Sequence, residues 1–147
     1  LAAYASTKLG IPSANVDVGG AGFGAELERS WLDHDVRAVK NVMRYLGILD
    51  EPLEKPERIL TYTWAPLINP SVGGLLVPER DPDELGREVR KGELLGRIIS
   101  PYTFEELERL EAPCDGWLRY MGRSYPIRPG DWAFGLAAAD GAEWVTP

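Results

Sequence analysis

The only histidine of the chain, His34, limits the metal chemistry that this sequence can support. Asp33 and Asp35 stand on either side of it, and zinc accepts imidazole and carboxylate ligands. The segment has helical periodicity, so three adjacent side chains point in three directions and cannot converge on one ion. A single histidine also excludes any site that needs two. We therefore predict an exposed histidine on the solvent side of its helix.

The only cysteine, Cys114, follows Ala-Pro and precedes Asp-Gly. A thiol nucleophile needs a base that helps to ionise it, and His34 lies far away in the sequence. One cysteine excludes an internal disulfide and a zinc site built from several cysteines. We predict a buried or incidental thiol.

Four glycines fall within residues 19–24, in the order Gly-Gly-Ala-Gly-Phe-Gly. Glycines let the backbone approach a ligand closely or adopt a positive φ. A phosphate-binding P-loop ends in Gly-Lys-Ser/Thr, and the dinucleotide fingerprint is Gly-x-Gly-x-x-Gly at the start of a helix. Residues 20–24 have the wrong spacing for either, so the sequence does not indicate a nucleotide site.

The charge and composition exclude several classes of protein. The 147 residues carry 16 basic and 23 acidic side chains, a net charge of -7, and lack the basic cluster that binds nucleic acid. A hydrophobic content of 44% is typical of a globular protein. No apolar run approaches the roughly 20 residues that cross a bilayer, and no signal peptide opens the sequence. We expect a cytoplasmic protein that binds neither nucleic acid nor membrane.

The first residues predict the end of an α/β unit. Residues 1–9 have apolar side chains at helical spacing, and Gly10 is a good helix stop. Residues 13–18 predict a short strand that runs into the glycines of 19–24. No capping residue precedes the helix, so the start is either processed or tagged, or the chain is the C-terminal part of a longer protein. We favour the second interpretation.

A longer helix is predicted over residues 30–46. Ser30 is a suitable N-cap, and Gly47 ends the periodic segment. An apolar stripe runs along it at steps of three and four residues, formed by Leu32, Val36, Val39, Met43 and Leu46. This spacing predicts an amphipathic helix.

Residues 51–58 are charged, contain two prolines and lack periodicity, so we predict a linker there. Beyond it, short runs between glycines and prolines predict an all-β module over 59–147. This module carries an internal repeat: Val-Arg-Lys-Gly-Glu at 89–93 matches Ile-Arg-Pro-Gly-Asp at 127–131, 38 residues later. The glycine of each copy is expected to form a turn. Two related hairpin units can pack face to face as a sandwich, and chance similarity of short segments is the alternative.

Seven segments spread over the chain carry a family resemblance: residues 10–12, 16–22, 36–49, 73–77, 89–96, 112–116 and 127–131. They resemble the C-terminal part of the succinylglutamate desuccinylase/aspartoacylase family. The resemblance implies an α/β fold in residues 1–50, as the end of a carboxypeptidase-like domain, and an all-β domain like a barrel-sandwich hybrid in residues 59–147. It also implies a zinc-dependent hydrolase that cleaves the amide bond of N-acyl amino acids or similar small molecules.

The resemblance implies a site that this chain holds only in part. Members of the family bind zinc through two histidines and a glutamate that lie upstream of the part resembled here, so no zinc is expected to bind this chain alone. A glutamate before the glycine segment is the general base in the family, and Asp17 stands at that position. Asp17 is either the remaining base, one methylene shorter, or a cap that binds backbone N–H groups of the glycine loop.

A non-catalytic relative that serves as a binding or interaction module is the alternative to a hydrolase. The second half also resembles biotinyl and lipoyl carrier domains, but residues 100–110 contain no lysine to modify, which argues against a carrier. Self-association to a homo-oligomer is left open, because exposed strand edges tend to pair.

Two further groups of side chains have a functional and a structural interpretation. Six basic residues either line an entrance for acidic substrates or lie on a solvated face: Arg90, Lys91, Arg97, Arg119, Arg123 and Arg128. Five tryptophans are expected to pack in the core and at its rim rather than to form a binding platform: Trp31, Trp64, Trp117, Trp132 and Trp144.

Overall fold

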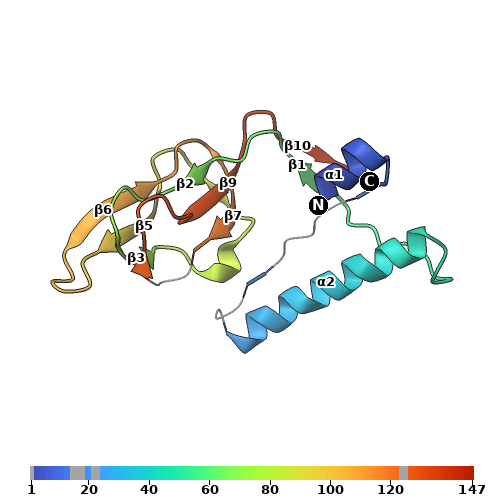
Figure 1. Cartoon of the computed structure of the whole chain (residues 1–147), viewed down its shortest axis with the longest axis horizontal. Coiled ribbons are helices and arrows are strands. Elements are labelled where there is room, and N and C mark those ends of the chain that lie inside the picture. The colour runs from blue at the N-terminus through green and yellow to red at the C-terminus, as the bar shows by residue number, and fades with distance from the viewer. Residues whose placement is uncertain (1, 14–18, 21–23, 123–125) are drawn as a thin grey trace. The chain divides into compact units, whose positions relative to one another are not determined.

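The structure, a computed structural model, describes residues 2–13, 19–20, 24–122 and 126–147 (Figure 1). The chain divides into two compact units, Leu1–Glu54 and Lys55–Pro147. The first unit holds two helices, and the second consists mostly of antiparallel strands. The predicted fold class is confirmed at this coarse level, since helices come first and antiparallel strands follow. The division into domains and a linker stays a prediction.

The first unit contains α1 (Ala2–Leu9) and α2 (Ala25–Tyr45). α1 ends as predicted, immediately before Gly10, whose φ is 65°. The prediction of Ser30 as N-cap is wrong, because α2 begins after Gly24, which enters the helix with a φ of 106°. The predicted strand 13–18 lies outside the described residues apart from Ser13. Among the described residues, no helix is long and apolar enough to span a bilayer.

The apolar stripe of α2 is exposed in the structure. Four of the five predicted stripe residues keep between 46% and 62% of their accessible surface: Leu32, Val36, Val39 and Leu46. The fifth, Met43, is half-buried, and no residue of α2, all of which the structure describes, is buried. The half-buried residues Trp31, Asp35 and Ala38 lie on another face, so the contacts of α2 within this chain leave most of the stripe uncovered. A helix of this kind ordinarily buries its apolar face, so the first unit presents an apolar surface.

The described part of the second unit contains ten short strands and one 3₁₀ helix, η1 (Pro82–Glu84). The strands are β1 (Ile59–Thr61), β2 (Leu67–Ile68), β3 (Gly74–Pro78), β4 (Glu88–Val89), β5 (Leu94–Ile99), β6 (Glu106–Glu111), β7 (Gly116–Met121), β8 (Pro126–Ile127), β9 (Phe134–Ala138) and β10 (Glu143–Val145). β1 pairs with β10, and the other strands form two four-stranded sheets in the orders β2-β9-β7-β4 and β6-β5-β3-β8 (Figure 1).

These two sheets contain two interlocked copies of one strand pattern. Strands β2–β5 form the first copy and β6–β9 the second, in the same order along the chain. When each strand is replaced by its counterpart in the other copy, the order β2-β9-β7-β4 becomes β6-β5-β3-β8. Strand β4 of the first copy pairs with β7 of the second, and β8 of the second pairs with β3 of the first. The register is the same in both places: Val89 faces Gly116, and Ile127 faces Gly74. Each copy therefore completes a sheet of the other.

The two turns of the repeat have the same geometry. Arg90 N–H donates a hydrogen bond to Glu93 Oε2 at 2.9 Å, and Arg128 N–H donates one to Asp131 Oδ2 at 2.9 Å. In each turn the residue before the acid has a positive φ, 81° at Gly92 and 84° at Gly130. A side chain would resist this conformation, so the glycines shape both turns.

A hydrophobic core lies within the second unit, and its largest fully buried side chains are Leu76, Leu95, Ile98, Leu118, Phe134 and Leu136. Neighbouring strands approach each other closely at Gly74 and Gly116, which occupy equivalent positions in the two copies. A Cβ atom at Gly116 would collide with the carbonyl of Ala137, and one at Gly74 would collide with that of Ile99. The five tryptophans are half-buried or exposed, so none of them packs in the core, and only the part of the prediction that places them at its rim is left.

Candidate functional site

Asp17, the candidate base, lies outside the described residues, so its role stays a prediction. The described glycine nearest to it shows why this segment needs glycine. Gly19 has a φ of 78°, and a Cβ atom on it would lie 2.9 Å from Cε3 of Trp31. The segment thus passes directly against the indole of α2, which leaves no room for a side chain.

His34 is exposed on α2, as the sequence predicts. Across the described residues, no three histidine, cysteine, aspartate or glutamate side chains come together in a way that could hold a metal ion. The flanking acids of His34 therefore do not join it in a site. The described residues do not fit the zinc centre that the family resemblance implies.

Cys114 is half-buried and packs against the core of the second unit. Burial raises the pKa of its thiol, the negative charge of Asp115 raises it further, and Lys91 opposes both effects. A raised pKa leaves less of the reactive thiolate at neutral pH. The structure thus agrees with a thiol that has no catalytic role.

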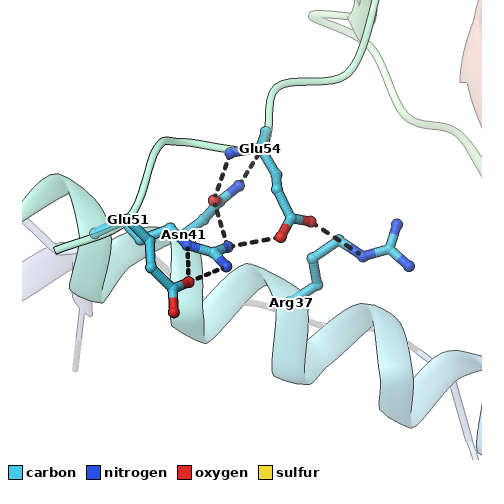
Figure 2. Close-up of polar contacts among 5 residues, drawn as sticks. Arg37, Asn41, Glu51 and Glu54 are labelled. Carbon is cyan, nitrogen blue, oxygen red and sulfur yellow. Dashed lines mark hydrogen bonds and ion pairs between the residues drawn. The ribbon is translucent and has the colours of Figure 1, made fainter. Parts of the chain in front are cut away.

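A group of polar contacts surrounds Arg44 near the end of α2 (Figure 2). Arg44 Nη2 lies 2.6 Å from Glu51 Oε2, and Arg44 Nη1 lies 3.0 Å from Glu54 Oε1. Asn41 binds the backbone of Glu54 twice, as acceptor from its N–H at 3.0 Å and as donor to its carbonyl at 2.5 Å. Arg37 Nε lies 3.7 Å from Glu54 Oε2. We call these five residues the Arg44 cluster.

The Arg44 cluster ties residues 50–54 back to the helix that precedes them. The side chain of Arg44 is only 8% exposed, and its hydrogen bond to Glu51 is the main reason why its pKa is raised. The cluster is not visible in the sequence, because Glu51 and Glu54 both fall within the predicted linker 51–58. The turn at Gly47, with a φ of 69°, returns them to the helix. Because the charges satisfy one another, the role of the cluster is structural: it fixes where the chain leaves α2.

The basic residues of the second unit are not gathered on one surface. Arg97 of β5 pairs with Glu79 at 2.5 Å, in one sheet. Arg119 of β7, in the other sheet, donates a hydrogen bond to the carbonyl of Leu136 at 3.2 Å. Arg123 lies outside the described residues. This distribution favours the interpretation of a solvated face over that of a common substrate entrance.

Two of the pockets that described residues line lie on the second unit. One, of about 550 Å³, lies beside Tyr120, Asp131 and Trp132. The other, of about 500 Å³, lies where β4 pairs with β7, and we call it the β4–β7 pocket. Its lining includes Glu88, Arg90, Glu93, Asp115, Gly116 and Trp117. The β4–β7 pocket is thus the one that brings charges of both signs to an aromatic ring.

Comparison with models of protein families finds no match to this sequence, and comparison with curated proteins finds none. Solved structures do match its fold. The ectoine utilization protein EutE (DoeB) of Ruegeria pomeroyi, in a product-bound structure, matches 92% of this chain and 40% of its own, with a TM-score of 0.72 and 22% identity. A succinylglutamate desuccinylase from a Silicibacter species matches 88% of this chain and 39% of its own, with a TM-score of 0.69 and 23% identity.

A succinylglutamate desuccinylase/aspartoacylase from Rhodobacter sphaeroides matches 80% of this chain and 37% of its own, with a TM-score of 0.62 and 22% identity. The chain therefore spans 37–40% of the length of these three proteins. The resemblance predicted from the sequence is confirmed at the level of the fold. This chain folds like a part of the succinylglutamate desuccinylase/aspartoacylase family proteins, and the coverage is consistent with their C-terminal portion.

Proposed function

We propose that this chain is the C-terminal portion of a deacylase that hydrolyses the amide bond of N-acyl amino acids or related compounds. The observation that carries the proposal is the exposed stripe of α2, in a chain that spans 37–40% of the matched proteins. In an α/β domain, such a helix covers a face of the sheet with its apolar side. The remainder of a carboxypeptidase-like domain would cover Leu32, Val36, Val39 and Leu46.

The second unit would then border the path of the substrate, as a barrel-sandwich hybrid. Its interlocked copies support this fold, because each four-stranded sheet takes strands from both copies. The core is closed by the pairing of β4 with β7 and of β8 with β3, so the unit offers a rigid wall rather than a flexible arm.

A zinc ion belongs to the proposed reaction, but the described residues of this chain do not fit it. His34 is exposed, and no group of suitable ligands forms among the described residues. The metal would be held by residues of a longer protein. The contribution of this chain to the chemistry would be Asp17, whose carboxylate would accept the proton of the attacking water as general base.

The activity of the longest gene product that contains this chain tests the proposal. We expect its upstream sequence to include a His-x-x-Glu motif, and the purified product to release free amino acid from an N-acyl amino acid. Replacement of Asp17 by asparagine should then lower kcat by about 100-fold or more, as for loss of a general base. An unchanged kcat would make Asp17 a cap of the strand. A longer product that hydrolyses no N-acyl amino acid would contradict the proposal.

A non-catalytic binding module is the second candidate, and the lack of a metal-binding group among the described residues favours it. The two candidates differ in the state of α2 in the natural protein. A deacylase covers the stripe, so hydrogen exchange along α2 should be slow in the natural protein and fast in this chain alone. A module that works alone should show the same rate of hydrogen exchange along α2 in the natural protein and in this chain alone.

A further inference from the structure

The β4–β7 pocket presents free charges of both signs beside an aromatic ring. Glu88 and Trp117 face each other across the pair of strands, and Arg90 lines the same pocket. Within the described residues, the side chains of Glu88 and Arg90 form no hydrogen bond or ion pair with each other or with another group. A carboxylate and a guanidinium in one pocket of about 500 Å³ are therefore available to a ligand.

The two other acids of the pocket are already engaged by the fold. Glu93 forms an ion pair with Arg80. Asp115 Oδ1 accepts a hydrogen bond from the N–H of Lys91 at 2.7 Å. In the other copy of the repeat Pro129 stands at the position of Lys91, and a proline has no N–H that needs an acceptor. Asp115 is thus explained by the structure of its turn, and the free charges that remain belong to Glu88 and Arg90.

The internal repeat shows that the fold does not require the side chains of Glu88 and Trp117. Their counterparts in the β8–β3 pair are Pro126 and Leu75, which face each other at the same register. The same ladder therefore forms without an acid and without an indole. Trp117 has one further contact, an edge-to-face packing on Trp144 with ring centroids 6.2 Å apart, whereas Glu88 has none. Strand pairing accounts for neither residue.

We propose that the β4–β7 pocket binds a zwitterion: an α-amino acid that carries both its ammonium and its carboxylate. Arg90 would bind the carboxylate, Glu88 the ammonium, and the indole of Trp117 would pack against the rest of the molecule. Both side chains are exposed, so a ligand with one charge would gain one ion pair, whereas a zwitterion would gain two. Pockets of this volume commonly hold small molecules. The proposal stands on the second unit and does not depend on the proposed deacylase.

Titration of the whole chain with L-alanine and with L-phenylalanine tests this proposal, followed through the NMR signal of the Trp117 indole N–H. We expect saturable shifts with both amino acids and much weaker binding of acetate or methylammonium, which carry one charge each and can form only one of the two ion pairs. Arg90→Gln and Glu88→Gln should each weaken binding about tenfold, as for loss of a charge-assisted hydrogen bond.

Arg128→Gln is the matched control, because Arg128 occupies the position of Arg90 in the other copy and does not line the β4–β7 pocket. It should leave the affinity unchanged, and the NMR spectrum of each variant reports whether it is folded. Absence of binding by both amino acids would overturn the proposal. So would binding that survives in folded Arg90→Gln and Glu88→Gln variants, and so would acetate that binds as tightly as alanine, which would indicate a simple anion site.

Discussion

Replacing Leu32 and Val39 of α2 together by glutamine should leave this chain as stable as before and remove about half of the exposed apolar stripe. Both residues lie in the exposed stripe, with 58% and 59% of their surface accessible. Glutamine has nearly the helix propensity of leucine and a better one than valine, so the helix itself is not weakened. The change in the free energy of unfolding should stay within about 0.5 kcal/mol, as for other surface substitutions.

The magnitude in a longer protein follows from the same exposures. The four exposed stripe residues, Leu32, Val36, Val39 and Leu46, keep 46–62% of their accessible surface, so roughly half of each side chain is left to cover. Complete burial of one such side chain is worth about 1.5–3 kcal/mol, so covering all four would contribute about 3–6 kcal/mol. The double substitution removes two of the four, and it should destabilise the longer deacylase by about 1.5–3 kcal/mol while sparing this chain.

Urea denaturation followed by circular dichroism measures the stability, and the fluorescence of an apolar dye such as ANS measures the exposed surface. Leu118→Ala is the control, because that side chain is fully buried in the second unit and its truncation should cost about 2–5 kcal/mol. Lower dye binding with unchanged unfolding is the expected result for the double variant. The opposite result is a loss of helix, or a free energy of unfolding reduced by about 2 kcal/mol or more. It would show that the stripe is buried in solution and that α2 is not exposed as described.

Three further predictions concern single residues. Gly116→Ala should destabilise the second unit by about 1–3 kcal/mol in the same urea assay, because its Cβ atom would collide with the Ala137 carbonyl; an unchanged midpoint would mean that the strands can separate there without cost. Arg44→Met should speed cleavage after Glu54 by endoproteinase Glu-C, because residues 50–54 lose their attachment to α2, and an unchanged rate would show that the Arg44 cluster does not hold the segment. Cys114 should react with Ellman's reagent more slowly than glutathione does at pH 8, because its raised pKa leaves less thiolate. The difference in rate should narrow as the pH rises through that pKa, and equal rates at pH 8 would contradict a raised pKa.

The sequence predicts local features of this fold well and long-range ones poorly. The periodicity of residues 30–46 indicates α2 and its stripe, and the repeated glycine turns indicate the two copies of the β unit. The start of α2 is missed because Ser30 looks like a cap, whereas the helix begins after Gly24, in a backbone conformation that glycine adopts readily. Strands β4 and β8 have two residues each, too few side chains to specify a partner, so the interlocking of the copies is not visible in the sequence.

The residues of the candidate sites are likewise predictable from the sequence only where the evidence is local. The lone histidine and cysteine suffice to predict that neither is catalytic, because each conclusion depends on a count and a local periodicity. The Arg44 cluster and the β4–β7 pocket depend on residues that only the folded chain brings together, such as Glu88 and Trp117. The sequence does not show which tryptophans are exposed, because a strand-like position does not say which face of a sheet a side chain occupies; Trp132, for example, is 58% exposed.

The decisive measurement is the zinc content of this purified chain, taken together with its hydrolysis of N-acyl amino acids. We expect the chain to fold, to bind no stoichiometric zinc and to release no amino acid, because the metal ligands of the proposed deacylase would belong to a longer protein. One zinc ion per chain with accompanying amide hydrolysis would contradict it, since the catalytic centre would then lie within these 147 residues.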